Sequence, residues 1–111
     1  KTPGLVTGLI ANPVAFIVAA EREGRIVGVG AGTLSGEITL NYVAPEARWS
    51  GVSKGLLALL EEMLADGGHA GARLTSTKTA HQFYKAQGYV DEGEPVDWRG
   101  SMAFPMLKAL W

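Results

Sequence analysis

The fold of this chain is decided by residues 43 to 57, which read Val43-Ala-Pro-Glu-Ala-Arg48-Trp-Ser-Gly51-Val-Ser-Lys-Gly-Leu56-Leu57. An alternation of apolar residues ends at Pro45, because proline cannot donate a hydrogen bond within a central strand. A helical period of apolar residues begins directly after Gly51. The stretch therefore predicts a strand, a loop and a helix in that order.

The start of this helix is a predicted anion-binding site. Backbone N–H groups in a first helical turn lack intrahelical partners, and the helix dipole adds partial positive charge there. Gly51 and Ser53 have small side chains that let a pyrophosphate approach the main chain, and Arg48 adds a fixed positive charge. We name residues 48 to 54 the phosphate loop, and its candidate ligand-binding residues are Arg48, Trp49, Ser50, Gly51, Val52, Ser53 and Lys54.

A second motif occupies residues 77 to 89, Thr77-Lys-Thr-Ala80-His-Gln-Phe83-Tyr84-Lys-Ala-Gln-Gly88-Tyr89. It resembles the Ala-x-x-Phe/Leu-Tyr-x-x-x-Gly-Phe/Tyr motif of GNAT-type N-acetyltransferases, a short helix ended by glycine. The phosphate loop is similar to the acyl-coenzyme A loop of the same superfamily, whose usual form is Gln/Arg-x-x-Gly-x-Gly/Ala, and Ser53 is a mild departure from it. The two motifs occur in the family's order, and the resemblance covers about residues 15 to 110.

The composition indicates one globular domain. A chain of 111 residues is long enough for a single core, so we expect one GNAT-like acyl-coenzyme A-binding domain over residues 1–111. Ten basic and eleven acidic residues give a formal charge of −1, which argues against an extended nucleic-acid or anionic-membrane footprint. The longest apolar stretch, Val14 to Ala20, is far shorter than the roughly 20 residues that span a bilayer, and no signal peptide is recognisable, so we expect a soluble, cytoplasmic protein.

The cysteine and histidine content limits the kinds of catalytic and metal site that the chain can form. The absence of cysteine excludes disulfides, thiolate metal sites and a covalent acyl-cysteine intermediate. The two histidines, His69 and His81, are isolated in the sequence, so we expect no metal site.

The expected order of elements is that of an α+β (α/β) fold. We expect a helix between Thr2-Pro3 and Asn12-Pro13, antiparallel strands at 15–21, 25–34 and 37–43, a helix at 51–65, a strand at 72–76, a short helix at 79–87, and an antiparallel pair at 89–96 and 101–107. The helical crossover implies parallel pairing for the strand at 72–76, and Pro105 suits an edge or bulge position. The order resembles a GNAT-like mixed antiparallel and parallel sheet flanked by helices, without the usual first strand and first helix. An apolar strand edge near residues 14–20 is expected to form a homodimer, to accept a swapped segment or to meet a covering loop.

Tyr84 is the candidate general acid. Consecutive residues on a helix cannot share a face, so an inward Phe83 would turn Tyr84 toward the groove beside the phosphate loop. A tyrosine with a pKa of about 10 can protonate a departing thiolate of comparable basicity, and the resemblance implies this role. The alternative is a tyrosine that only lines the channel for the pantetheine arm of coenzyme A.

Glu37 is the candidate general base. It begins the strand that ends at Val43, and an amine that is protonated at neutral pH needs a carboxylate or a water to accept its proton. The pattern Glu37-Ile-x-x-x-Tyr42-Val43 is similar to that of the superfamily, in which the glutamate is the base in some members and not in others. A solvated or N–H-capping carboxylate beside the Ser35-Gly36 turn is the alternative, and Glu21 is a weaker second candidate for the base.

Three further positions complete the expected site. Backbone N–H groups near Tyr42 and Val43 could polarise the thioester carbonyl where the strand splays, similar to the β-bulge of the superfamily. Thr77 occupies the place where many members carry an asparagine that contacts the pantetheine arm. His81 is a neighbour of Tyr84 on the helix surface, and we expect it to be solvated rather than a second proton carrier.

The sequence thus predicts an N-acetyltransferase. The expected reaction transfers an acetyl group from acetyl-coenzyme A to a primary amine of a small molecule or peptide, by direct attack in a ternary complex. One alternative is a non-catalytic acyl-coenzyme A-binding domain for sensing or interaction, which needs the phosphate loop and neither proton carrier. Another is a toxin-like acetyltransferase of charged tRNA, which calls for a basic patch that a net charge of −1 does not favour.

Overall fold

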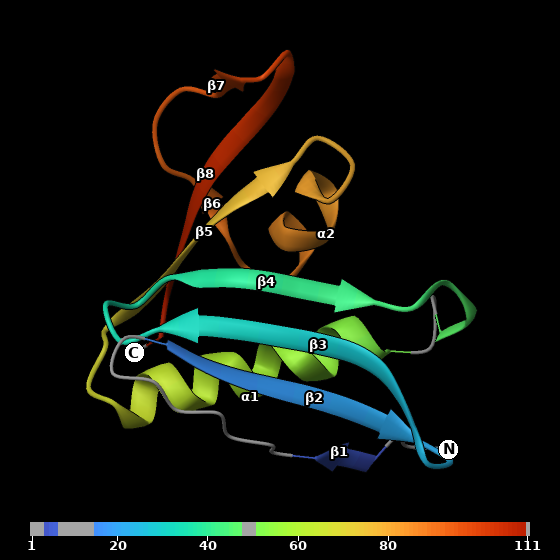
Figure 1. The fold of residues 1–111 in the computed structure, drawn as a ribbon. Helices are drawn as coiled ribbons and strands as arrows, with labels where there is room; N and C mark the ends of the chain where they lie inside the picture. Colours follow the sequence, from blue (N-terminus) through green and yellow to red (C-terminus); the bar gives the residue numbers. More distant parts are fainter. Residues whose placement is uncertain (1–3, 7–14, 48–50, 111) are drawn as a thin grey trace.

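The structure, a computed structural model, describes residues 4–6, 15–47 and 51–110 (Figure 1). Its strands are β1 (Gly4–Val6), β2 (Ala15–Arg22), β3 (Arg25–Thr33), β4 (Ile38–Val43), β5 (Gly71–Thr77), β6 (Val90–Asp91), β7 (Val96–Trp98) and β8 (Ser101–Ala109). Its helices are the 3₁₀ turn η1 (Pro45–Ala47), α1 (Val52–Asp66) and α2 (His81–Ala86). The expected elements from residue 15 onward are confirmed, except that the strand expected at 89–96 is two short strands.

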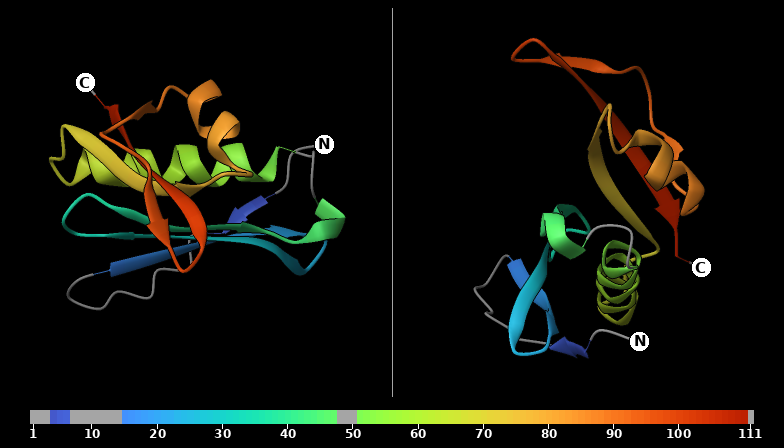
Figure 2. Two further views of the ribbon diagram at one scale, coloured as in Figure 1. Left: turned by 90° about the horizontal axis from the view of Figure 1, so that it is seen from above. Right: turned by 90° about the vertical axis from the view of Figure 1, so that its right-hand side faces the viewer.

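The strands form two sheets within the described residues. β1, β2, β3 and β4 form an antiparallel sheet in sequence order, whereas in the other sheet β8 lies between β5 and β6 and also pairs with β7. α1 contacts β2, β3, β4 and β5, and Figure 2 shows it on one face of the first sheet. The α+β class expected from the sequence is therefore confirmed.

The core lies between α1 and the first sheet. Positions of α1 that recur every three or four residues are buried, namely Val52, Leu56, Leu57, Leu60 and Leu64. They belong to the same buried cluster as three β2 side chains, Phe16, Val18 and Ala20. Glycines of β3 allow this close approach, because a Cβ at Gly30 would stand 2.9 Å from Leu60 Cδ1 and one at Gly28 would stand 2.8 Å from Leu56 Cδ1.

Residues 4–6 form a strand where the sequence predicted a helix. β1 pairs antiparallel with residues 19–21 of β2. An open strand edge offers hydrogen bonds to any nearby segment, and the local helix signal at Thr2-Pro3 contains no information about that edge. The remainder of the expected helix lies outside the described residues. β1 also covers part of the edge at 14–20 for which a covering segment was expected.

Pro105 lies in a central strand, which corrects the edge or bulge position expected for it. On one side of β8 it faces Thr75 of β5, and on the other side β8 pairs with β6 and β7. The Pro105 carbonyl accepts a hydrogen bond from the Glu92 N–H at 2.8 Å. Both backbone groups of a residue in an antiparallel strand point to the same side, so the missing N–H falls at the gap between β6 and β7.

The starts of β4 and β5 run parallel, as the crossover implied, but they are joined at one point only within the described residues. Glu37 and Arg73 form an isolated parallel bridge, and the Arg73 N–H donates to Gly36 O at 3.0 Å. Beyond this bridge the strands diverge, so that β4 leads toward the N-terminus of α1 and β5 leads into α2 (Figure 1). We call the bridge the closed end of this pair and the region of Val43, Gly51 and Thr77 its open end.

Candidate functional site

The described half of the phosphate loop is the N-terminus of α1. Gly51 is the N-cap residue with φ +84°, a left-handed conformation that favours glycine, and no side chain caps the helix there. The N–H groups of Val52 and Ser53 therefore have no partner within the helix. Lys54 is exposed beside them. Arg48, Trp49 and Ser50, which complete the predicted loop, lie outside the described residues.

β4 directs one row of backbone groups toward the open end. The Ala44 N–H donates to Val27 O at 2.8 Å, and hydrogen bonding alternates along an antiparallel pair, so Tyr42 also points its backbone groups toward β3. The N–H groups of Asn41 and Val43 consequently point away from β3, toward the diverging β5. These are fixed donors on an edge that carries no neighbouring strand within the described residues.

Two details of β4 correct the sequence prediction. The irregularity in the β3–β4 ladder lies between Ala31 and Gly32, opposite the start of β4, and not at Tyr42 and Val43. The Tyr42 side chain is 54% exposed. Of the two residues predicted to polarise the thioester, only Val43 therefore offers its N–H to the open end.

Tyr84 lies on α2 and packs into the core. Phe83 was expected to face inward and Tyr84 to face the groove beside the phosphate loop, but both side chains are partly buried against the core cluster. The Tyr84 ring meets the Tyr89 ring edge to face, with centroids 5.7 Å apart. Burial raises the pKa of Tyr84, and the Asn41 side chain opposes this by lowering it. A raised pKa keeps the phenol protonated at neutral pH, as a general acid requires.

Asn41 is a site residue that the sequence analysis missed. It pairs with Gly30, so its side chain lies on the face of β4 that α1 covers. Both polar atoms of its amide are buried and have no hydrogen-bond partner among the described residues. The local sequence gives no signal for this, because the environment of Asn41 arises only where β4, α1 and α2 meet.

A hydrogen-bonded group of Tyr89, Glu61 and Lys108 holds the ring against which Tyr84 packs. The Tyr89 hydroxyl donates to Glu61 Oε2 at 2.8 Å, and Lys108 Nζ donates to Glu61 Oε1 at 3.0 Å. Burial, followed by the hydrogen bond to Glu61, raises the pKa of Tyr89. The group joins α1 to β8 across separations of 28 and 47 residues, which explains why a local pattern could not reveal it.

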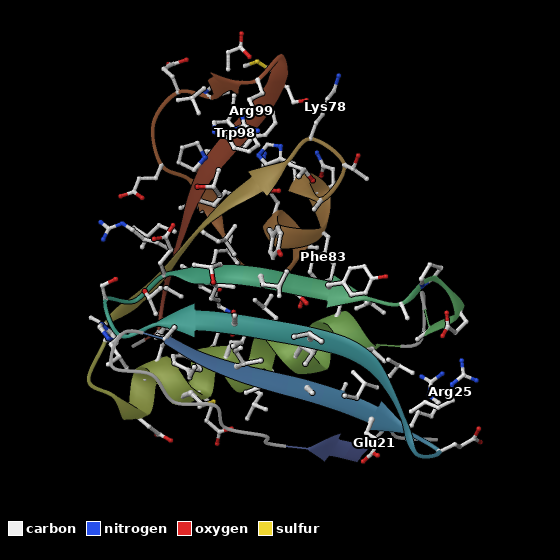
Figure 3. All side chains as sticks on the ribbon, in the orientation of Figure 1. Glu21, Arg25, Lys78, Phe83, Trp98 and Arg99 are labelled. Carbon is white, nitrogen blue, oxygen red and sulfur yellow. The ribbon has the colours of Figure 1, made fainter. Side chains whose placement is uncertain are left out.

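The two carboxylates predicted as bases lie away from Tyr84. Glu37 is exposed at the closed end, and its N–H donates to Thr33 Oγ1 at 3.2 Å. Along the strand Glu37 is about 13 Å from Asn41, the residue of β4 whose side chain lowers the pKa of Tyr84. Glu21 is on β2, which β3 separates from β4, and Figure 3 shows it far from Phe83 of α2. The structure therefore brings Tyr84 together with Asn41 but not with a predicted base.

Thr77 and the two histidines have structural contacts. Thr77 Oγ1 accepts the Ala80 N–H at 3.2 Å, where the chain turns from β5 into α2. His81 is paired with Asp91 at 2.6 Å and stacks on Phe104 with ring centroids 4.1 Å apart. The His81 ring is thus largely buried rather than solvated as expected. His69 Nε2 donates to Leu34 O at 2.8 Å, which ties the turn after α1 to the turn before β4.

The described residues offer neither a metal cluster nor a spanning helix. Within 4–6, 15–47 and 51–110, no three His, Cys, Asp or Glu residues gather so as to hold a metal ion. No helix in these ranges has the length and apolar character needed to cross a membrane.

Solved structures resemble the chain over most of its length. A nourseothricin acetyltransferase matches with a TM-score of 0.81 and 23% identity, over 89% of this chain and 67% of its own. PaiA N-acetyltransferase from Thermoplasma acidophilum, solved in complex with coenzyme A, matches with a TM-score of 0.70 and 22% identity, over 86% of this chain and 61% of its own. An acetyltransferase from Bacillus cereus ATCC 14579 matches with a TM-score of 0.78 and 25% identity, over 94% of this chain and 79% of its own. The chain thus shares their fold and spans 61 to 79% of their lengths.

One family model covers nearly the whole chain. It describes an acetyltransferase (GNAT) domain and matches residues 5–110, a range that includes the phosphate loop and the motif at 77–89. Among curated protein sequences, none matches the chain. The family model, the fold and the two sequence motifs agree, and the chain belongs to the GNAT acetyltransferase family, a family of enzymes that use acetyl-coenzyme A.

Proposed function

We propose that this chain transfers an acetyl group from acetyl-coenzyme A to a primary amine of a small molecule or peptide. The observation that carries the proposal is the N-terminus of α1 at the open end, where Gly51 adopts φ +84° and no side chain of the described residues caps the first turn. Such a helix start favours an anionic group. Membership of the GNAT family supports acetyl-coenzyme A as the donor.

The residues at the open end fit coenzyme A in one orientation, with its pyrophosphate at the phosphate loop and its pantetheine arm along β4. The phosphate loop would hold the pyrophosphate through the N–H groups of residues 51–54, with Arg48 adding charge. The pantetheine arm would then follow β4, whose Asn41 and Val43 N–H groups point toward β5. Thr77 can still donate its hydroxyl proton to that arm, since its oxygen already accepts the Ala80 N–H. On this reading residues 1–111 act as one acyl-coenzyme A-binding domain.

The chemistry then requires one bond to form and one to break. The amine nitrogen bonds to the acetyl carbon, and the carbon–sulfur bond breaks with its electron pair going to sulfur. The protonated amine loses one proton before attack, to Glu37 or to water, and the attacking nitrogen loses a second proton to water as the amide forms, while Tyr84 gives one proton to the sulfur. Holding both reactants in one complex supplies much of the rate, and no acyl-enzyme intermediate is needed. The alternative role for Tyr84, lining the pantetheine channel, leaves sulfur to be protonated by water.

The test measures binding and turnover on the full chain. Calorimetry should show coenzyme A binding that weakens as ionic strength rises, because the phosphate contacts are electrostatic. A thiol assay with a panel of small amines and peptides should show release of coenzyme A from acetyl-coenzyme A. Absence of binding would overturn the proposal. Binding without turnover on any amine would instead favour the non-catalytic acyl-coenzyme A-binding domain.

A further inference from the structure

Asn41 holds an unsatisfied amide at the candidate site. Its Nδ2 and Oδ1 atoms are both buried, and neither has a hydrogen-bond partner within the described residues. Burying an amide without a hydrogen bond destabilises a fold, so native proteins satisfy nearly all such groups. An exception beside a candidate catalytic side chain calls for a functional explanation.

The fold places this amide and the Tyr84 phenol on the same side of β4. Asn41 faces α1 because its partner Gly30 does, and a Cβ at Gly30 would stand 2.9 Å from Leu60 Cδ1 of α1. Tyr84 packs from α2 against the core cluster that contains Leu60. Within this space the Asn41 side chain lowers the pKa of Tyr84 against the effect of burial, although no hydrogen bond between them is completed.

The charged and titratable groups around Tyr84 come from several elements. Tyr89 lies beside its ring, and Glu61 of α1 is engaged by Tyr89 and by Lys108 of β8. His81, one turn earlier on α2, is paired with Asp91. These groups are hydrogen-bonded to one another, whereas the buried Asn41 amide has no partner within the described residues and is free to bond the Tyr84 oxygen.

We propose that Asn41 positions the Tyr84 hydroxyl and stabilises the phenolate left after Tyr84 protonates the departing sulfur. This rests on the acetyl transfer proposed above. In that step the Tyr84 O–H bond breaks, an S–H bond forms, and the negative charge moves from sulfur to the phenol oxygen. An N–H of Asn41 Nδ2 would donate to that oxygen, and a proton from solvent would restore the phenol before the next turnover. Asn41 is on this view a positioning residue, since it acts through Tyr84.

The decisive experiment follows the titration of Tyr84 without any substrate. The chain has three tyrosines, so carbon-13 at the tyrosine Cζ gives three NMR signals, which Tyr84→Phe and Tyr42→Phe assign. In Asn41→Leu, which has a similar branched shape and no polar side-chain atoms, we expect Tyr84 to titrate at higher pH. The melting temperature should stay level or rise, because an unsatisfied buried amide has been removed. With acetyl-coenzyme A and an accepted amine, kcat should fall about tenfold and KM for acetyl-coenzyme A should hold.

A second variant keeps the test informative if Asn41→Leu folds poorly. Asn41→Ser retains a hydroxyl donor and should recover part of both the titration and kcat. An unchanged Tyr84 titration in a folded Asn41→Leu would overturn the proposal, and so would a large loss of melting temperature with kcat unaltered, which marks a purely structural residue. Failure of the proposed function is visible separately, as absence of acetyl transfer by the wild type on every amine.

Discussion

The two ends of α1 both carry a glycine with positive φ, yet the backbone N–H groups at the two ends differ in their hydrogen-bond partners. At the C-terminus the N–H groups of Gly67, Gly68 and His69 donate to carbonyls of the last helical turn, at 3.0 to 3.1 Å. At the N-terminus Gly51 has φ +84°, close to the +93° of Gly68, and no side chain caps the helix. Among the described residues, the chain satisfies one end of α1 with its own groups, whereas the first-turn donors at the other end have no partner within the helix and can bind a ligand.

The strands beside the helix repeat this contrast. At the closed end the Arg73 N–H bonds Gly36 O, and the Arg73 guanidinium bonds the Glu92 carboxylate through two nitrogens at 3.1 to 3.2 Å. At the open end the Val43 N–H points to no neighbouring strand in the described part of the chain, and the Asn41 amide is unsatisfied. Polar groups without protein partners therefore gather at one end, which is how a site for a polar ligand differs from a structural junction.

The largest expected effect comes from exchanging glycines at the two ends of α1. Gly51→Val should weaken coenzyme A binding by about 100-fold or more, because the side chain strains a left-handed backbone and projects where the pyrophosphate must approach. Gly68→Val is the matched control, since Gly68 also has positive φ and also has open space at its Cβ position among the described atoms. Calorimetry with coenzyme A on both variants makes the comparison.

Equal losses of affinity in the two variants would contradict the assignment of the phosphate loop. Backbone strain alone would then explain the result, since both substitutions impose it. Thermal melting of both variants separates this case, because strain of similar size should lower both melting temperatures similarly.

Tyr84→Phe should give the next largest effect, on turnover rather than on binding. The ring packing against Tyr89 is kept and only the hydroxyl is removed, so kcat should fall by about 100-fold or more while coenzyme A affinity holds. Because burial raises the pKa of Tyr84, the wild type should stay active into alkaline pH and lose activity as pH rises through that pKa. The variant should lack this alkaline limb. A variant that turns over like the wild type would leave Tyr84 as a channel-lining residue.

Glu37→Gln should have a moderate effect that depends on pH. If Glu37 accepts the amine proton through water, the variant should lose about tenfold in kcat at neutral pH and recover at high pH, where the amine is already deprotonated. Glu21→Gln is the control, since Glu21 lies beyond β3 from the site. Equal activity of Glu37→Gln and Glu21→Gln at every pH would make Glu37 a solvated carboxylate of the closed end.

The local parts of this architecture could be predicted from sequence, and the long-range parts could not. Pro45, Gly51 and the apolar period after Gly51 located the start of α1, because all of these signals act within one turn of chain. Gly88 marked the end of α2 for the same reason, and it has φ +99°. Residues 4–6, by contrast, pair with β2, and their conformation is set by a strand edge that the local helix signal does not include.

The candidate site was predictable in part for similar reasons. The motif at 77–89 placed Tyr84 on a short helix, but whether Tyr84 faces inward depended on Tyr89 and its bond to Glu61. Asn41 has no local signal at all, because its burial needs α1 and α2 together. The path of β5 away from β4 likewise follows its pairing with β8, a strand that lies some thirty residues later in the sequence.

The smallest expected effect concerns the ion pair between Arg73 and Glu92 at the closed end. Arg73 holds the pKa of Glu92 below its ordinary value, mainly through their hydrogen bonds. A carboxyl whose folded pKa is depressed contributes stability above its unfolded pKa and loses that contribution as pH falls through the folded pKa. Glu92→Gln should therefore lower the melting temperature slightly at neutral pH, and the difference from wild type should shrink below the ordinary pKa of a glutamate and vanish below the lowered pKa of folded Glu92. The effect is small because both side chains are well exposed.

Glu94→Gln is the matched control for this pair, because Glu94 is exposed in the same loop and makes no ion pair within the described residues. Its melting temperature should follow the wild type at every pH. Coenzyme A affinity should be unchanged in both variants, since the Arg73–Glu92 pair belongs to the closed end and the ligand donors belong to the open end. A loss of coenzyme A affinity in Glu92→Gln without a pH-dependent loss of stability would mean that the two ends are coupled, and the division between a structural end and a ligand-binding end would then be wrong.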